Sequence, residues 1–193
     1  MKKHLSEIKK MYPQPISIIE LKRIADAVMY VRDNMIENCS PHQTCFYTSY
    51  IGCRLINRKD YNISLTNIKI RTVIEGTDDV PFFGLDARID PEHWHCVILR
   101  AEKDNTRPLE TIDFNIGAIC RAFVEQGGVW NRDILPEWIR LKDSEQDKYG
   151  IFYTTYPIEL VNARQKEVQS CIPFAEELVK RAMSILKSSS KSK

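Results

Sequence analysis

The segment TCFYTSYIGCRL, residues 44–55, decides the fold that we predict for this chain. Its apolar residues recur at helical spacing on more than one face. They are Phe46, Tyr47, Tyr50, Ile51, Cys53 and Leu55. A helix that is apolar on several faces must be buried on most sides. We therefore predict a central buried helix over residues 43–58, preceded by a turn at 39–42.

Cys45 lies in the first turn of this predicted helix. That position places its sulfur near unpaired backbone N–H groups and near the positive end of the helix dipole. Both effects favour the thiolate, which is the reactive form of cysteine. Cys45 is therefore a candidate nucleophile, and the alternative is a buried structural cysteine.

Helices, then strands, then helices again surround this segment. Ser17 and Glu20 form a capping box that begins a helix running to about Asn38. Alternating or β-branched residues predict strands at 67–75, 94–101, 109–114 and 149–156. Other predicted elements are a loop at 76–91, a hairpin turn at 103–106, a helix at 116–126, irregular structure at 129–148, and helices at 157–168 and 173–187. This order indicates an α+β fold, with N-terminal helices packed on an antiparallel sheet and helices at the C-terminal end, rather than alternating βαβ units.

Two neighbouring strands carry an acid and a base. His95 begins the apolar run HCVIL, and Asp113 lies near the end of the next predicted strand. If the two strands pair around the turn at 103–106, the start of the first lies beside the end of the second. Asp113 can then fix the tautomer of His95, and His95 can take the proton of a thiol. The alternative for Asp113 is a surface carboxylate or a cap for the helix at 116.

These residues also carry a resemblance to a known family. The segment Thr44–Leu55, followed by a strand, resembles the cysteine helix of the papain-like cysteine protease superfamily, in its transglutaminase-like branch. His95–Leu99 and Thr111–Phe114 resemble its His strand and its Asp strand, so the resemblance covers roughly residues 40–116. It implies a papain-like fold and a Cys45–His95–Asp113 triad that attacks an amide or ester carbonyl through a thioester. Peptidases, amidases, deamidases and acyltransferases use this chemistry, but the papain run Cys-Gly-Ser-Cys-Trp is absent here.

Other residues are candidates for oxyanion or substrate binding. The backbone N–H of Cys45 and the side chain of Gln43 can donate to a developing oxyanion. His93 shares a strand face with His95, so either histidine can be the base, and we favour His95 because it starts the apolar run. Trp94 can line a substrate cleft, or it can belong to the core.

Two other functions remain open from the sequence. Cys39, His42 and Cys45, together with His93 and His95, can ligate zinc through sulfur and nitrogen. A non-catalytic interaction domain on the same scaffold is also compatible with these residues.

Composition narrows the class of protein. The chain has 193 residues, 28 basic and 26 acidic side chains and a formal net charge of +2, which gives no electrostatic case for nucleic acid as a partner. No apolar run is long enough for a membrane span, and we expect no membrane partner and no cofactor. We expect one domain over 1–187, a disordered Ser/Lys tail at 188–193, reduced cysteines and a cytoplasmic protein. The expected partner is a peptide, protein or small amide substrate, and the oligomeric state is left open.

Overall fold

The computed structural model describes residues 14–37, 41–70, 80–83, 95–101, 109–125, 136–142, 145, 151–155 and 158–189. Its helices are α2 (Ile18–Met35), α3 (Pro41–Ile56), α4 (Ile116–Glu125) and α5 (Ile158–Ser189). Its strands are β1 (Tyr61–Ile70), β2 (Val80–Phe83), β3 (His95–Arg100), β4 (Glu110–Asp113), β5 (Ile139–Lys142) and β6 (Ile151–Thr155). The protein is therefore of the α+β class, as the order of elements predicts.

The strands form one antiparallel sheet. Its order is β2-β1-β3-β4-β5, and β6 also pairs with β1. Strands β3 and β4 pair with Ile98 opposite Ile112, which confirms the predicted pairing of these two segments. Because both strands run antiparallel in this register, the first residue of β3 and the last residue of β4 meet at the same end of the sheet.

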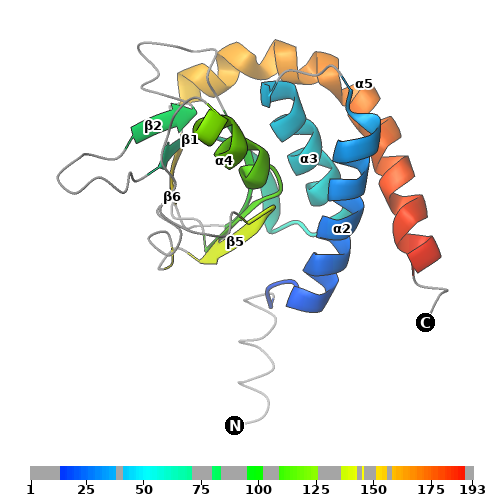
Figure 1. Ribbon diagram of the computed structural model, residues 1–193. Helices are drawn as coiled ribbons and strands as arrows, with labels where there is room; N and C mark the ends of the chain where they lie inside the picture. Colours follow the sequence, from blue (N-terminus) through cyan, green and yellow to red (C-terminus); the bar gives the residue numbers. More distant parts are fainter. Residues whose placement is uncertain are drawn as a thin grey trace, which may run out of the picture.

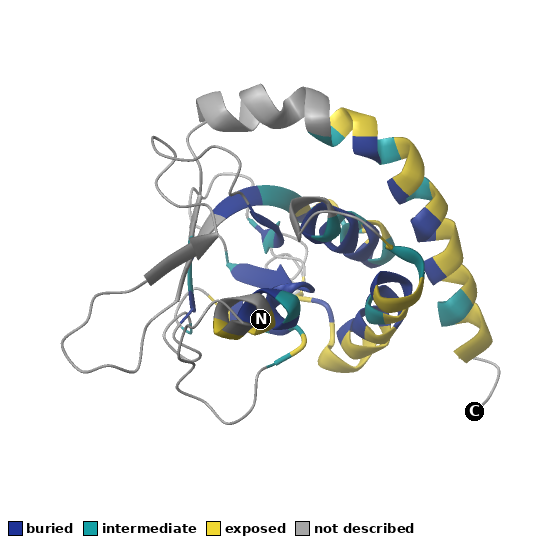
Figure 2. Ribbon diagram, turned by 45° about the horizontal axis from the view of Figure 1, so that its top comes forward, coloured by how far each residue is buried: buried dark blue, intermediate teal, exposed yellow. Residues whose placement is uncertain are grey.

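Two apolar clusters cover the two faces of the sheet. On one face, α2, α3 and α5 pack against residues such as Cys96, Ile98 and Ile112. On the other face, α4 packs with Ile68 of β1 and with apolar residues of β5 and β6. Figure 1 shows α4 on one side of the strands and α2, α3 and α5 on the other. In Figure 2 the buried residues of these helices lie toward the sheet, and the exposed residues lie toward solvent.

Helix α2 begins as its sequence predicts. Ser17 is the N-cap, and its hydroxyl accepts a hydrogen bond from the backbone N–H of Glu20 at 3.2 Å. Its apolar stripe, including Leu21 and Val28, is buried in the core. Local capping and periodicity are sufficient here because the helix needs only one buried face.

Gly52 allows α3 to pack closely on the sheet. A Cβ at this position would lie 2.2 Å from Cε2 of Phe114 and 2.9 Å from Cδ1 of Ile98. Ser49, one turn earlier, donates a buried hydrogen bond from its hydroxyl to the carbonyl of Cys96 at 2.9 Å. These two contacts fix the height of α3 above β3, and Cys45 lies on the same helix face two turns before Gly52.

Several predicted boundaries are wrong. Helix α3 begins at Pro41 rather than in a turn, because proline suits the first helical position. Strand β1 begins at Tyr61, where alternation of Tyr61, Ile63 and Leu65 starts earlier than the predicted strand at 67. Strand β2 lies within the predicted loop at 76–91, and β5 lies within the segment predicted as irregular. Both strands have four residues, too few to establish a period.

One C-terminal helix replaces the two that the sequence predicts. Pro173 lies inside α5, which continues to Ser189 and so extends two residues into the predicted tail. Proline removes one backbone hydrogen bond and bends a helix, but contacts along its length can hold both halves together. Figure 1 shows α5 changing direction as it passes over α3 and α2. Within the described residues, no helix is both long and apolar enough to cross a bilayer.

Candidate active site

Cys45, His95 and Asp113 come together at one end of the sheet. Cys45 comes from α3, His95 is the first residue of β3, and Asp113 is the last residue of β4. Nε2 of His95 lies 2.8 Å from Oδ2 of Asp113. The three residues are 1%, 1% and 0% exposed, so the cluster is shielded from water. Shielding strengthens every charge interaction among them.

The strand geometry explains how two layers supply these groups. Side chains alternate along a strand, so His95 and Asp113 lie on the α4 face while Cys96 lies on the α3 face. Cys45 reaches the start of β3 from α3, and its sulfur accepts a hydrogen bond from the backbone N–H of Cys96 at 3.3 Å. The thiol of Cys45 is also hydrogen-bonded to the side chain of His95.

The environment of Cys45 favours the thiolate. Burial alone would raise the pKa of this thiol, but the hydrogen bond with the Cys96 side chain and the charge of His95 outweigh it and lower the pKa to about 5. Helix α3 begins at Pro41, so Cys45 lies in its second turn, where an N–H has a partner within the helix. This position corrects the predicted placement in the first turn. Contacts with Cys96 and His95, rather than unpaired N–H groups of α3, account for the low pKa.

His95 is held in the protonated form. Burial lowers its pKa, but the charges of Asp113 and Cys45 and the hydrogen bonds with both raise the pKa to about 10. Because Nε2 contacts Asp113, the other ring nitrogen, Nδ1, is left for the sulfur of Cys45. At neutral pH the pair is therefore a thiolate and an imidazolium, which is the reactive state of a cysteine nucleophile with its base.

Three donors surround the carboxylate of Asp113. His95 and the hydroxyl of Tyr153 both contact Oδ2 at 2.8 Å, and the backbone N–H of Asn115 donates to Oδ1 at 2.7 Å. A carboxylate with three donors is stabilised as the anion even when it is fully buried. Asp113 thus orients His95 and also fixes the turn before α4.

Tyr153 is the site residue that the sequence analysis missed. It lies in β6, opposite Ile68 of β1, and is 40 residues along the chain from Asp113. The segment 149–156 predicted a strand, but nothing local predicts which strand it pairs with or what the hydroxyl of Tyr153 contacts. The pairing of β6 with β1 and the packing of Tyr153 against the cluster under α4 bring it to Asp113.

The remaining predicted residues are placed only in part. Gln43 lies in the first turn of α3, but its side chain is outside the described structure, as is that of His42. Cys39, His93 and Trp94 lie outside the described residues altogether. The roles of Gln43, His93 and Trp94 in oxyanion or substrate binding, and the choice between His93 and His95, stay predictions.

The structure also bears on the zinc hypothesis. Of its five residues, it brings together Cys45 and His95, and His95 is engaged by Asp113 through Nε2. Among the described residues, no group of three His, Cys, Asp or Glu side chains is arranged to hold a metal ion. The cysteines that the structure describes, Cys45, Cys53, Cys96, Cys120 and Cys171, are free thiols.

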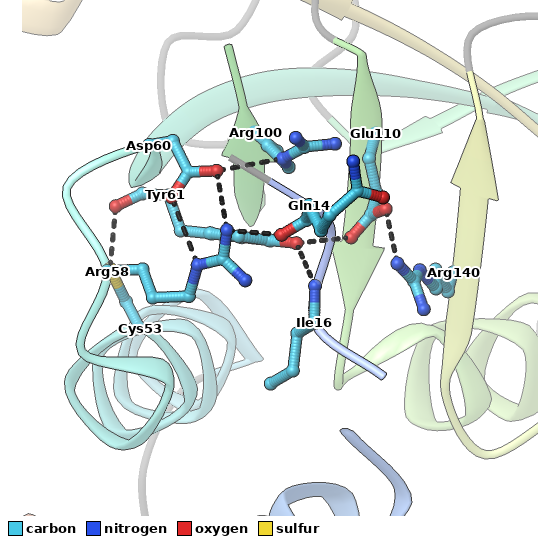
Figure 3. Close-up of polar contacts among 9 residues, drawn as sticks. All are labelled: Gln14, Ile16, Cys53, Arg58, Asp60, Tyr61, Arg100, Glu110 and Arg140. Carbon is cyan, nitrogen blue, oxygen red and sulfur yellow. Dashed lines mark hydrogen bonds and ion pairs between the residues drawn. The ribbon is translucent and has the colours of Figure 1, made fainter. Parts of the chain in front are cut away.

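A second buried polar cluster lies at the opposite end of β3 (Figure 3). The carboxylate of Glu110 accepts from the hydroxyl of Tyr61 at 3.0 Å and from Nη2 of Arg140 at 2.6 Å. Nearby, Nε of Arg100 donates to Asp60 at 2.9 Å. Tyr61 also accepts the backbone N–H of Ile16 at 3.0 Å, which ties the start of the described chain to the sheet. This cluster joins five segments, and the thiol at its edge, that of Cys53, donates to the carbonyl of Tyr61 (Figure 3) and has a pKa raised by burial.

Comparisons with known proteins show a shared fold. No family model matches the chain, and no curated protein matches it. One solved structure, a crystal structure described only as a genomics target, matches with a TM-score of 0.56 and 14% sequence identity. The match covers 86% of this chain and 78% of that one. At this identity the likeness shows a shared fold alone.

Proposed function

We propose that this protein is a cysteine-dependent hydrolase or acyltransferase that acts on an amide or ester carbonyl. The observation that supports the proposal is the continuous line of contacts from the sulfur of Cys45 through the ring of His95 to the carboxylate of Asp113. Nucleophile, base and orienting acid have the mutual contacts that such a triad requires. The state of the pair agrees, since thiolate and imidazolium coexist at neutral pH.

The proposed reaction begins with attack of the Cys45 thiolate on the carbonyl carbon. The C–S bond forms as the carbonyl π electrons move to oxygen. The resulting oxyanion then re-forms the C=O bond as the C–N or C–O bond breaks, and the protonated His95 gives its proton to the departing amine or alcohol. A thioester remains on Cys45. Neutral His95 next takes a proton from water or from an acceptor amine, which attacks the thioester and releases Cys45. Asp113 holds the ring in position through Nε2 in both halves of the reaction.

We further propose a papain-like scaffold of the transglutaminase-like type. Its support is the arrangement of elements: a buried helix bears the cysteine and packs on an antiparallel sheet, and two paired strands bear the histidine and the aspartate. A peptide, a protein or a small amide fits this chemistry as substrate. A low-pKa thiolate is easily oxidised, so we propose a reducing compartment, the cytoplasm, as the place of action.

Selective alkylation tests the proposal without a known substrate. The protein is treated with iodoacetamide between pH 5 and 9, and the rate at each cysteine is measured by peptide mapping. Cys45 should react fastest at pH 6–7 although it is 1% exposed. Cys53 and Cys120 serve as controls within the same chain, because burial raises the pKa of each thiol above its ordinary value. Because a buried sulfur reacts only when covering atoms move, the pH dependence of each rate is compared rather than its size.

One variant, Cys45→Ala, decides between the functions when its labelling, turnover and zinc content are measured beside those of the wild type. Cys45→Ala should lose all labelling at this position and all turnover of activated ester or amide probes, while circular dichroism stays native. Equal, slow labelling of every described cysteine would refute an activated nucleophile and leave a non-catalytic domain. Stoichiometric zinc in the purified protein, lost in Cys45→Ala, would replace the triad by the metal site.

A further inference from the structure

Tyr153 donates a hydrogen bond to the aspartate of the proposed triad. Its hydroxyl donates to Oδ2 of Asp113 at 2.8 Å, the same oxygen that faces Nε2 of His95. Burial and the charge of Asp113 raise the pKa of Tyr153 well above its ordinary value, so the phenol is always a donor. The carboxylate oxygen of Asp113 that faces His95 is therefore shared with a second donor, the Tyr153 hydroxyl.

We propose that Tyr153 is a positioning residue, which fixes Asp113 and limits how strongly this carboxylate retains the proton on His95. The inference rests on the proposed function and deepens it. A carboxylate that shares one oxygen between two donors has its charge dispersed by both. The imidazolium then gives up its proton to a leaving group more readily than it would beside an unshared carboxylate.

Other titratable groups lie close to His95 and Asp113, and their protonation states determine which charges surround these two residues. Cys45 approaches His95 from α3, and Cys96 follows His95 in β3. Cys120 of α4 lies near Asp113, whose charge contributes to its raised pKa of about 12. Burial also holds the thiol of Cys96 well above its ordinary pKa. At pH 6–9 Cys96, Cys120 and Tyr153 thus keep their protons, and the Cys45–His95 pair changes its protonation only outside this range, near pH 5 and near pH 10.

Tyr153→Phe tests the inference, because it keeps the ring and removes only the hydroxyl. Loss of this donor concentrates the charge of Asp113 on His95, so the imidazolium persists to higher pH. The alkaline limb of the Cys45 alkylation profile follows the His95 pKa of about 10, so the alkylation is extended to about pH 11.5. We expect this limb to shift upward by about 0.5–1 pH unit. Turnover of an ester or amide probe should fall by about threefold to thirtyfold, mainly in kcat.

The chain offers a matched control. Tyr61 is also a buried tyrosine whose hydroxyl donates to a buried carboxylate, that of Glu110, at 3.0 Å. Tyr61→Phe removes the same group from the same sheet at the other end of β3. It should lower thermal stability about as much as Tyr153→Phe and leave the alkylation profile of Cys45 unchanged.

The outcomes separate this inference from the proposed function. A low-pKa Cys45 in the wild type, with no change in its profile in Tyr153→Phe, would overturn the inference alone. An equal shift in Tyr61→Phe would also overturn it, since the effect would then come from general loosening. An unactivated Cys45 in the wild type would overturn both. If Tyr153→Phe fails to fold, 3-fluorotyrosine at position 153 replaces it; this more acidic phenol is a stronger donor, and the alkaline limb should move downward, whereas an unmoved limb would refute the inference.

Discussion

The two ends of β3 each bury a carboxylate that accepts a hydrogen bond from a tyrosine, but the cations beside them differ. At the Glu110 end the partner is Arg140, whose planar guanidinium donates to the carboxylate in a fixed geometry. At the Asp113 end the partner is His95, which can gain or lose a proton. The first arrangement holds segments together. The second stores a proton beside a thiolate, and this difference separates a structural cluster from a candidate active site.

Removing the charge from each carboxylate should show the difference between the two ends of β3 most clearly. Asp113→Asn leaves His95 without its anionic partner, so the pKa of Cys45 returns toward that of an ordinary thiol. Such a thiol is only a few per cent ionised at pH 7. We expect the rate of Cys45 alkylation at pH 7 to fall about tenfold to thirtyfold, as measured by peptide mapping.

Glu110→Gln is the matched change at the other end. It leaves Arg140 without a counter-charge and weakens the hydrogen bond from Tyr61, so unfolding in urea should require about 2 kcal/mol less free energy. Cys45 alkylation should keep its wild-type rate. Comparable losses of reactivity in both variants would show that the two ends are coupled and would contradict the division between them.

Gly52 tests the same difference through helix α3, which spans both ends of β3. Gly52→Ala places a Cβ 2.2 Å from a ring carbon of Phe114, so α3 must move away from β3. We expect a loss of about 1–3 kcal/mol in the free energy of unfolding, despite the better helix propensity of alanine. Displacing α3 also weakens the contact of Cys45 with the N–H of Cys96, so alkylation at pH 7 should slow.

A nearby surface residue provides the control for Gly52. Arg54 has an exposed side chain that pairs with Glu176 at 3.3 Å. Arg54→Ala alters α3 without touching the sheet and should change the free energy of unfolding by less than about 1 kcal/mol. If Gly52→Ala were equally mild, the close approach of α3 and β3 would not be what positions Cys45.

Local rules in the sequence account for a large part of this fold. The capping box at Ser17 placed α2 because cap and periodicity both act within a few residues. The short connection between the segments of β3 and β4 predicted their antiparallel pairing, and the pairing in turn predicted that His95 and Asp113 would be neighbours. These conclusions need only contacts between adjacent elements.

The features that the sequence did not predict depend on distant contacts. Cys96 lies inside the apolar run HCVIL without any local sign of a role, yet its N–H and thiol contact the sulfur of Cys45 because α3 packs on β3. Tyr153 reaches Asp113 only because β6 pairs with β1. Pro173 suggested a break between two helices, whereas packing of α5 on α3 keeps it within one. None of these pairings leaves a local pattern.

The smallest expected effect is on the pH dependence of stability, and it follows from proton counting. In the folded protein the pKa of Cys45 is lowered from 9.0 to about 5, and that of His95 is raised from 6.5 to about 10. Between pH 5 and 6.5 the unfolded chain binds one more proton than the folded pair, so stability from this pair rises with pH. Between pH 6.5 and 9 both states bind one proton and the contribution is flat. Above pH 9 the folded pair holds the extra proton, and stability falls until pH 10.

Cys45→Ala should remove the range between pH 6.5 and 9 in which the contribution of this pair to stability is flat. His95 then titrates alone with a pKa still raised by Asp113, so the folded state holds an extra proton from pH 6.5 upward and stability declines there. The free energy of unfolding in urea is measured at pH 7.5 and at pH 8.5. Between these two values the Cys45–His95 pair should contribute no change in the wild type, whereas the variant should lose at most about 1.4 kcal/mol. Glu110→Gln should run parallel to the wild type, because it leaves the Cys45–His95 pair intact and the pKa of Tyr61, raised mainly by burial, is about 12. A plateau in Cys45→Ala would mean that Asp113 alone does not raise the pKa of His95 above its ordinary value, and the charge partnership proposed for the active-site end would be refuted.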